Sequence, residues 1–488
     1  MITVMGRPRR TCAGYTRRQL LQAGGAGLFG LTLPRVLSAA ATPSLNALPA
    51  RARARSVLFV FLYGGPSQLE TFDMKPDAPS NIRGPYRPIA ARTPDLRICE
   101  HLPRLAARSD RYCVIRTVNH RQNDHNGTHY IQTGHPLPPA QRGADNVDAT
   151  DRDWPAFGSV VEHLDERLQR SRSFPGYIYL PRRLGHMAGY NINGQYAGWL
   201  GRAYDGIAAN IGKRHATDNP FFRDCTDDEL DFRLAGLDPY PEVTLERFGR
   251  RDSLRDQLDA RRRQFDHSPA VRDFTGQRAR AAGLLASERV AAAFDIRREP
   301  ARLRDQYGRN LFGQSLLMGR RLIEAGARFV TVAWDLAVRG DVMGSWDMHA
   351  GLERVMKDHL LPGLDWGLSA VLDDLQARGL LDETLVIAVG EMGRTPRFEN
   401  RGQQDGRDHW SYCYPCVLAG AGIRGGIAYG RSDSDAAWPS DRPVSPEDLA
   451  CTIYHTLGID PHAHALHDRQ GRPVALVDGG EILTALFA

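Results

Sequence analysis

Runs of apolar residues alternate along this chain with segments of helical periodicity. Five of these runs are typical of strands buried in a sheet, and each ends in glycine or is followed by a polar residue. They lie at 56–65, 112–118, 327–334, 384–390 and 415–420. Gly64 and Gly65 end the first run, where glycine allows the backbone to turn sharply. The pattern predicts a sheet of buried strands.

The segments between these runs predict helices. Leucine and valine recur at helical spacing from Leu364 to Leu375, and Gly379 ends that stripe. Ser445 and Asp448 have the spacing of a capping box at the start of a further helix. Helices alternating with buried strands predict an α/β fold, with a mostly parallel sheet and helices on both faces. Ligand sites in such folds lie beyond the carboxyl ends of the strands.

The region from about residue 150 to 305 has a different pattern. Charged helical segments and loops fill it, and no buried strand run is evident. We therefore expect a largely helical insertion that covers an edge of the sheet, with a lid as one role. The chain contains no internal repeat and no low-complexity tract.

The N-terminal residues have the order of an export signal. Arg17 and Arg18 precede an apolar stretch at 20–33 that glycines interrupt, and alanines at 39–41 form a small-residue cleavage site. The apolar stretch is shorter than the roughly 20 residues of a membrane span. This order is typical of a twin-arginine signal peptide.

We accordingly divide the chain into residues 1–41 as the signal peptide, 42–55 as a flexible mature N-terminus and 56–488 as the folded domain. The twin-arginine translocase would be a partner during export. The mature protein would then be periplasmic or otherwise extracytoplasmic, with no stable membrane span after cleavage.

The net charge does not indicate a polyanion partner. The chain carries 63 basic and 57 acidic residues, and six of the basic ones lie in the first 41 residues, which contain no acid. Removal of that segment leaves 57 basic against 57 acidic residues. We therefore expect no nucleic-acid binding.

The cysteines predict neither a disulfide framework nor redox chemistry. Seven cysteines in 488 residues are too few for such a framework. Cys413 and Cys416 have the spacing of a redox motif, but they lie in an apolar run with no helical pattern after it. We interpret that run as a buried strand.

Three polar groups that follow predicted strands could bind a metal ion. They are Asp347 with His349, then Glu391, then Asp408 with His409. Carboxylate oxygens and imidazole nitrogens suit zinc, with manganese, calcium and iron as alternatives.

Each of these groups also has an alternative interpretation without a metal. Asp347 and His349 could be ordinary loop residues. A buried carboxylate at a strand end needs a partner because an unpaired charge is costly to desolvate. Arg394 in the same turn could supply that partner to Glu391 as a structural ion pair.

The loop after the second predicted strand, residues 119–134, is rich in imidazoles. It contains His120, Asp124, His125, Thr128 and His129. The Thr128 hydroxyl could act as a nucleophile if a metal or an imidazole such as that of His125 favours its deprotonated form. The alternative is a polar loop whose histidines cap neighbouring helices.

Motifs spread over nearly the whole chain resemble one family. They are LFVFLYGGPSQLETFDMKPDAP, NDHNGTHYIQTG, FGQSLLMGRRLIEAGARFVTV, WDMH, LLDETLVIAVGEMGRTP, GRDHW and DRPVSPEDLACTIYHTLGID. Together with the export signal they resemble the DUF1501 proteins, which are similar to the alkaline phosphatase and sulfatase superfamily. The resemblance implies an alkaline phosphatase-like fold and a metal site for ester hydrolysis.

The resemblance also suggests roles for individual residues. Thr133 and Gly134 match the end of the superfamily's nucleophile loop, and Asp347 with His349 matches a ligand loop. Glu391 takes the place of the aspartate in the superfamily's Asp-His-Gly motif. Met392 stands where the histidine would be, and His409 matches a late histidine ligand.

This sequence departs from the superfamily at further points. The first strand ends in glycines where the superfamily has an aspartate ligand, and Glu70 or Asp73 could substitute for that aspartate. The spacing from Thr133 does not choose among Asp124, Thr128 and neighbouring residues as nucleophile. The cysteine motif of true sulfatases is absent.

The leading hypothesis is an exported, metal-dependent hydrolase of phosphate or sulfate esters. Its substrate would be a small molecule or a polysaccharide ester. The predicted metal ligands are Asp347, His349, Glu391, Asp408 and His409. The predicted catalytic residues are Thr128, His125 and Arg394, with Arg394 or Arg407 binding the anionic group through paired hydrogen bonds. The alternative is a non-catalytic envelope protein that binds a ligand at a degenerate site.

Overall fold

The structure is a computed structural model, in which the described residues belong to one compact unit, Arg51–Ala488. The described residues are 53–138, 148–168, 174–185, 191–211, 219–234, 287–335, 338–339, 342–343, 345–401, 404–462, 465–468 and 470–487. The predicted signal peptide, residues 1–41, lies outside them. Among these residues, no helix is both long enough and apolar enough to cross a membrane.

A nine-stranded sheet forms the centre of this unit, in the order β17-β4-β16-β11-β1-β8-β5-β6-β7. Only β16 and β7 run antiparallel to the other strands. The strands are β1 (Ser56–Leu62), β4 (Tyr112–Val118), β5 (Tyr177–Leu180), β6 (Ile207–Ile211), β7 (Phe232–Leu234), β8 (Phe329–Trp334), β11 (Thr384–Val389), β16 (Tyr414–Ala419) and β17 (Ile427–Tyr429). The predicted fold class is confirmed.

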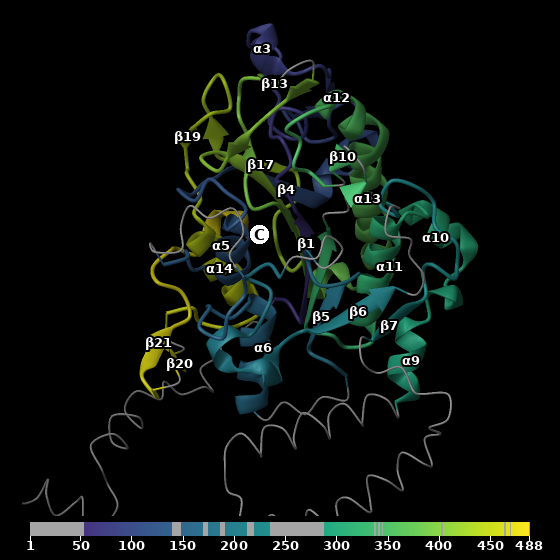
Figure 1. Cartoon of the computed structure of the whole chain (residues 1–488), viewed down its shortest axis with the longest axis vertical. Coiled ribbons are helices and arrows are strands. Elements are labelled where there is room, and N and C mark those ends of the chain that lie inside the picture. The colour runs from purple at the N-terminus through teal and green to yellow at the C-terminus, as the bar shows by residue number, and fades with distance from the viewer. Residues whose placement is uncertain are drawn as a thin grey trace, which may run out of the picture. The chain divides into compact units, whose positions relative to one another are not determined.

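Side chains of the sheet alternate between two hydrophobic cores. On β1, Leu58, Val60 and Leu62 pack into one core, and Val57, Phe59 and Phe61 pack into the other. This alternation follows from the two-residue period of a strand. The helices α11 (Leu311–Glu324) and α13 (Leu361–Ala377) cover the first core, and α6 (Phe157–Arg167) and α14 (Pro446–Thr456) cover the second (Figure 1).

Short elements complete the described part of the chain. The helices are α3 (Ser80–Arg83), α4 (Pro103–Ala106), η1 (Ser109–Arg111), α5 (Gly127–Thr133), η3 (Gly198–Leu200), η4 (Arg202–Tyr204), α9 (Glu288–Phe294), η5 (Ile296–Arg298), α10 (Ala301–Tyr307), α12 (Leu352–Val355), the π-helix η6 (Met356–Leu360), η7 (Leu381–Glu383) and η8 (Thr484–Leu486). The strands are β2 (Pro88–Ala90), β3 (Arg97–Cys99), β9 (Val338–Arg339), β10 (Val342–Met343), β12 (Gly393–Arg394), β13 (Glu399–Arg401), β14 (Gln404–Gly406), β15 (His409–Trp410), β18 (Arg431–Ser432), β19 (Pro439–Asp441), β20 (Ala465–His467) and β21 (Pro473–Ala475).

The region expected to be a helical insertion also contributes three strands to the sheet. The expectation that it holds no buried strand is wrong, because β5, β6 and β7 extend the sheet beyond β8. These strands have only three to five residues each, and β6 is half-buried. Such short runs give little periodic signal. Residues 235–286, where further helices were expected, lie outside the described residues.

The last residues of the predicted flexible N-terminus are tied to the domain. The backbone N–H groups of Arg53 and Ala54 donate to the carbonyl of Thr456, and that of Arg55 donates to Glu383. Backbone pairing of this kind anchors the chain immediately before β1.

The six cysteines beyond the N-terminal segment are buried, and five of them form no disulfide in the described part of the chain: Cys99, Cys113, Cys413, Cys416 and Cys451. Cys416 lies on β16, as the apolar run predicted. Burial raises the pKa of the Cys413 and Cys416 thiols above the ordinary range. A thiol that is not readily ionised is a poor redox nucleophile.

A buried charge cluster joins α11 and α13 beneath the sheet. The Arg320 guanidinium is fully buried and lies 2.9 Å from Glu299 and 2.7 Å from Asp374. Glu324 adds a third contact at 2.6 Å. Tyr307 donates its hydroxyl to Asp374 at 2.9 Å. Arg320 therefore compensates carboxylates that are themselves shielded from water.

Replacement of Arg320 by Met tests this compensation. We expect the free energy of unfolding to fall by about 1.5–3 kcal/mol, because Glu299 and Asp374 would each lose one of the guanidinium groups that contact them and keep another. Urea unfolding followed by circular dichroism measures the change. The control Arg302→Met alters an exposed side chain on α10. A similar small effect of both replacements would contradict the prediction.

Candidate metal centre

The polar residues that the sequence singled out come from loops beyond the carboxyl ends of three strands and from a short ribbon. His125 follows β4, Asp347 and His349 follow β8, and Glu391 follows β11. The two-stranded ribbon β12-β15 adds the rest, since its register places Arg394 opposite His409. Parallel strands end at one edge of a sheet, which is why residues distant in sequence meet here.

Gly64, at the end of β1, is required for this meeting. Its φ is +102°, and a Cβ at this position would lie 2.2 Å from the backbone nitrogen of Asp347. A residue with a side chain would push the Asp347 loop away. The Gly64 N–H also donates to both carboxylate oxygens of Glu391, at 2.9 and 3.1 Å. The sequence indicated a turn at Gly64 but not this second role.

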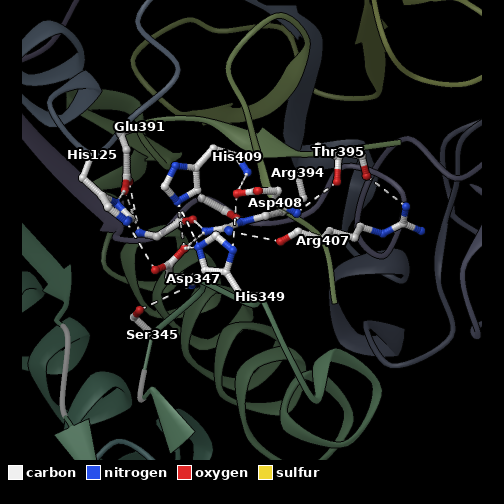
Figure 2. Close-up of polar contacts among 12 residues, drawn as sticks. His125, Ser345, Asp347, His349, Glu391, Arg394, Thr395, Arg407, Asp408 and His409 are labelled. Carbon is white, nitrogen blue, oxygen red and sulfur yellow. Dashed lines mark hydrogen bonds and ion pairs between the residues drawn. The ribbon is translucent and has the colours of Figure 1, made fainter. Parts of the chain in front are cut away.

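Asp347 is the common partner of the other groups (Figure 2). Its side chain is 4% exposed. The Oδ1 atom lies 2.5 Å from Nη2 of Arg394, 3.0 Å from Nε2 of His349 and 3.2 Å from Nε2 of His409. The Oδ2 atom lies 3.2 Å from Nε2 of His125. One carboxylate thus contacts a guanidinium and three imidazoles.

Two of these imidazoles also face each other. The Nε2 atoms of His349 and His409 are 3.1 Å apart. With Asp347 Oδ1 they form a triangle whose sides are 3.0, 3.1 and 3.2 Å. Donors bound tetrahedrally to one zinc ion at about 2.0–2.1 Å lie about 3.3 Å apart. The spacing and chemistry of this donor set therefore fit a divalent ion.

The donor set divides into two overlapping groups of nearby ligand atoms. One consists of His125, Asp347 and His409, and the other of His349, Asp408 and His409. Asp408 contributes Oδ1, which lies 3.3 Å from Nδ1 of His349 and accepts the His409 backbone N–H at 2.9 Å. His409 is shared by the two groups, so it is the residue on which any ion in this centre would depend most.

Glu391, which was predicted as a metal ligand, instead contacts His125. Its Oε1 lies 2.9 Å from Nδ1 of His125. The Gly64 N–H donates to the same carboxylate and fixes its position. Glu391 therefore orients the ring of His125, whose Nε2 atom faces Asp347. Metal-binding histidines commonly have such a carboxylate on the second nitrogen. The structural alternative of a Glu391–Arg394 ion pair is not observed, because Arg394 pairs with Asp347.

The electrostatics of the cluster favour charged forms in the absence of a metal. Burial alone would raise the pKa of Asp347, but Arg394 and the three imidazoles outweigh it and hold that pKa well below its usual range. Burial alone would lower the pKa of His125, but hydrogen bonds to Asp347 and Glu391 outweigh it and raise the pKa to about 9. A metal ligand at His125 must therefore displace a proton at neutral pH.

Arg394 and Arg407 are both fully buried and already occupied. Beyond Asp347, Arg394 donates to the carbonyls of Gly64, Gly65 and Arg407. Arg407 makes a bidentate contact with Glu70, with Nη2 to Oε1 at 2.6 Å. These arginines fix the backbone around Asp347, and neither presents a free pair of donors to an anionic ligand.

The imidazole-rich loop contributes one residue to the cluster. Its histidines at 120 and 129 contact backbone carbonyls. His120 contacts the backbone carbonyl of Glu391 at 2.7 Å, and burial lowers the pKa of His120 to about 4. His129 contacts the His135 carbonyl at 2.9 Å. The Thr128 hydroxyl is buried and makes no hydrogen bond to any described residue.

Neither proposed substitute for the missing strand-end aspartate lies in the centre. Glu70 is bound by Arg407, and Asp73 contacts Lys75 at 3.1 Å and the Ser432 hydroxyl. Asp124 accepts the backbone N–H of Asn126 at 2.8 Å, as in a local turn. The first strand therefore supplies a backbone N–H in place of a carboxylate.

The fold and this cluster define an α/β protein with a histidine and carboxylate centre at the carboxyl edge of a mostly parallel sheet. The chain belongs to the DUF1501 family, described as "Protein of unknown function (DUF1501)", which matches residues 54–487. No curated protein matches the sequence.

Solved structures with a similar arrangement are distant. The PsFucS1 sulfatase from Pseudoalteromonas sp. has 10% identity and a TM-score of 0.38, with 83% of this chain and 68% of that chain covered. The phosphonate monoester hydrolase SpPMH from Silicibacter pomeroyi has 10% identity and a TM-score of 0.37, covering 88% and 76%. BT4656, in complex with D-glucosamine-2-N,6-O-disulfate, has 13% identity and a TM-score of 0.34, covering 89% and 82%.

The contacts of His125 predict an unusual titration in metal-free protein. We expect its pKa to be about 9, and Glu391→Gln to lower it because one of the two stabilising carboxylates is lost. The raised pKa contributes stability that is fully present below the ordinary value of 6.5 and is lost as the pH rises through about 9.

Nuclear magnetic resonance of ¹⁵N-histidine-labelled protein measures this pKa, with His125→Gln to assign the signal. The control Glu353→Gln changes an exposed carboxylate outside the cluster. An ordinary titration of His125 near 6.5, or no response to Glu391→Gln, would contradict the assigned contacts.

Proposed function

We propose that this protein is a metal-dependent hydrolase of phosphate or sulfate esters. The observation that carries the proposal is the triangle of Asp347 Oδ1, His349 Nε2 and His409 Nε2, with sides of 3.0 to 3.2 Å. Zinc suits these donors best, with manganese, calcium and iron as alternatives. A divalent ion held there would act as a Lewis acid that stabilises charge on a phosphoryl or sulfuryl oxygen.

The surrounding residues prepare this centre. Arg394 holds Asp347 through Oδ1, and Glu391 holds Nδ1 of His125 at 2.9 Å. Arg394 and Glu391 are buried. Their positions are therefore already fixed before a substrate binds. The guanidinium groups of Arg394 and Arg407 already donate hydrogen bonds to protein carbonyls and carboxylates. Recognition of an anionic ester would therefore depend mainly on the metal. Arg394 is therefore a positioning residue in this proposal.

The nucleophile in this proposal is the Thr128 hydroxyl or a water molecule near the centre. Thr128 has no hydrogen bond to lose among the described residues, so Thr128→Val is a shape-conserving replacement without a structural cost. A direct role for Thr128 predicts loss of turnover with unchanged metal content and unchanged or higher stability. Full turnover by Thr128→Val would assign the attack to water.

The alternative is a non-catalytic protein that binds a ligand at this centre. Two observations favour it: both buried arginines are occupied, and the Thr128 hydroxyl contacts none of the cluster residues. The two hypotheses differ in turnover, because only a hydrolase releases nitrophenol from generic esters.

Metal content and turnover together test the hydrolase. We expect purified wild-type protein to bind a divalent ion and to hydrolyse 4-nitrophenyl phosphate or sulfate. The double variant His349→Ala/His409→Ala removes two donors of the triangle and should lower both bound metal and turnover by at least about 100-fold. Elemental analysis and a nitrophenol assay across zinc, manganese, calcium and iron measure the two quantities.

His462→Ala is the matched control, since His462 is exposed and outside the cluster. Full turnover after thorough metal removal, or unchanged metal content in the double variant, would reject the proposal. Metal binding without turnover on any ester would favour the binding protein.

We also propose that the protein is exported as a folded unit by the twin-arginine route. The buried cysteines support this, because Cys99, Cys113, Cys413, Cys416 and Cys451 form no disulfide in the described part of the chain, as expected of a domain that folds in a reducing compartment. The ester substrate would then be met outside the cytoplasm, and a polysaccharide or a small molecule would suit.

Replacement of both Arg17 and Arg18 by Lys tests this route. We expect the precursor to remain in the cytoplasm, because the translocase recognises the arginine pair. Cell fractionation and immunoblotting measure the distribution. The control replaces Arg9 and Arg10 by Lys. Equal export of both variants would contradict the proposal.

A further inference from the structure

A cavity lies away from the metal centre, beside the helices α10, α11 and α13. Figure 1 shows these helices on one face of the sheet. Its volume is about 340 Å³, which is in the range of small-molecule sites, roughly 300–1,000 Å³. Three parts of the chain line it: the loop at 221–224, the turn between α10 and α11, and the segment from η6 into α13. None of its lining residues belongs to the cluster around Asp347.

Aromatic rings form much of the wall. Trp366 on α13 is 40% exposed, which is unusual for a large apolar side chain in this domain. Arg104 covers one face of Trp366 at 3.5 Å from the ring centroid. Phe222 and His359 stack on each other, with centroids 4.2 Å apart and an angle of 3° between the rings. An open cavity with flat aromatic groups suits a ligand with an extended apolar face.

The polar groups that line the cavity include more carboxylates than guanidinium groups. Arg309 pairs with Asp305 at 2.6 Å, and Arg223 pairs with Glu229 at 2.5 Å. Both arginines that line the cavity therefore already have a carboxylate partner. Asp224 and Asp358 make no ion pair with any described residue, so the cavity offers both hydrogen-bond donors and acceptors with excess negative charge.

The backbone supports a positioning role for one side of the cavity. Asp358 and His359 lie on η6, which is a π-helical turn of five residues between α12 and α13. Turns of this kind are rare, and they recur where side chains are placed for function. The π-helical winding determines where these two side chains lie relative to Trp366.

From these observations we propose that this cavity is a binding site for a neutral saccharide, separate from the metal centre. Sugar rings have apolar faces that pack on Trp and Phe rings, and their hydroxyl groups both donate to carboxylates and accept from guanidinium groups. An ammonium compound would use only the carboxylates, and a sulfated or phosphorylated sugar would be repelled by Asp224 and Asp358. The site would hold a glycan chain independently of any reaction at Asp347.

Isothermal titration calorimetry with soluble neutral oligosaccharides of the cello, malto and laminari series tests the proposal. We expect at least one series to bind, and Trp366→Ala to weaken that binding by about tenfold or more, since large aromatic contacts dominate small interfaces. Asp358→Ala, at an exposed side chain on the polar side of the cavity, should weaken it as well. Unchanged thermal unfolding would show that both variants fold.

The matched control is Trp438→Ala. Trp438 is 51% exposed and packs against Trp410 and Tyr412, away from the cavity. The same titrations on metal-stripped protein and on His349→Ala/His409→Ala should give wild-type affinity, which separates this site from the proposed hydrolase centre.

Several outcomes would overturn the proposal. They are the absence of binding to every neutral series, equal binding by Trp366→Ala and wild type, and a loss caused by Trp438→Ala but not by Trp366→Ala. Preferential binding of tetramethylammonium, or of a sulfated oligosaccharide, with the same dependence on Trp366 would also reject a neutral saccharide.

Discussion

The buried carboxylate of Asp347 is the constraint on which this structure depends. A carboxylate that is 4% exposed loses most of its hydration, so its charge must be compensated by neighbouring groups. Arg394, His125, His349 and His409 supply that compensation, and they come from three different parts of the chain. The loop after β4, the loop after β8 and the β12-β15 ribbon are therefore held together by one negative charge.

The groups around this carboxylate are themselves held by hydrogen bonds to other parts of the protein. Gly64 lets the backbone approach Asp347 closely and gives its N–H to Glu391. Glu391 in turn fixes the ring of His125. Arg394 uses its remaining donors on backbone carbonyls, as Arg407 does around Glu70. Both guanidinium groups thus bind protein carbonyls and carboxylates. The imidazoles remain as the part of the centre that can bind a cation.

The proposed metal centre and the proposed saccharide cavity are connected through one continuous segment. His349 is followed by α12, η6 and α13, and the last two of these line the cavity. The two sites differ in their charge balance. In the first, three imidazoles surround a carboxylate, whereas in the second each arginine is neutralised and aromatic rings dominate. A protein that acts on a glycan ester would use the first for chemistry and the second for holding the chain.

The central strands and the polar residues that follow them could be predicted from the sequence, because burial on both faces leaves a local signature of apolar runs. The sequence therefore identified β1, β4, β8, β11 and β16, and it placed Asp347, His349 and His409 beyond strand ends. The pairing of the polar groups became visible in the folded chain. Arg394 contacts Asp347 and not Glu391, Glu391 orients His125, and the short strands β5, β6 and β7 join the sheet. Pairing and edge-strand formation depend on neighbours distant along the chain, and a one-dimensional pattern does not contain that information.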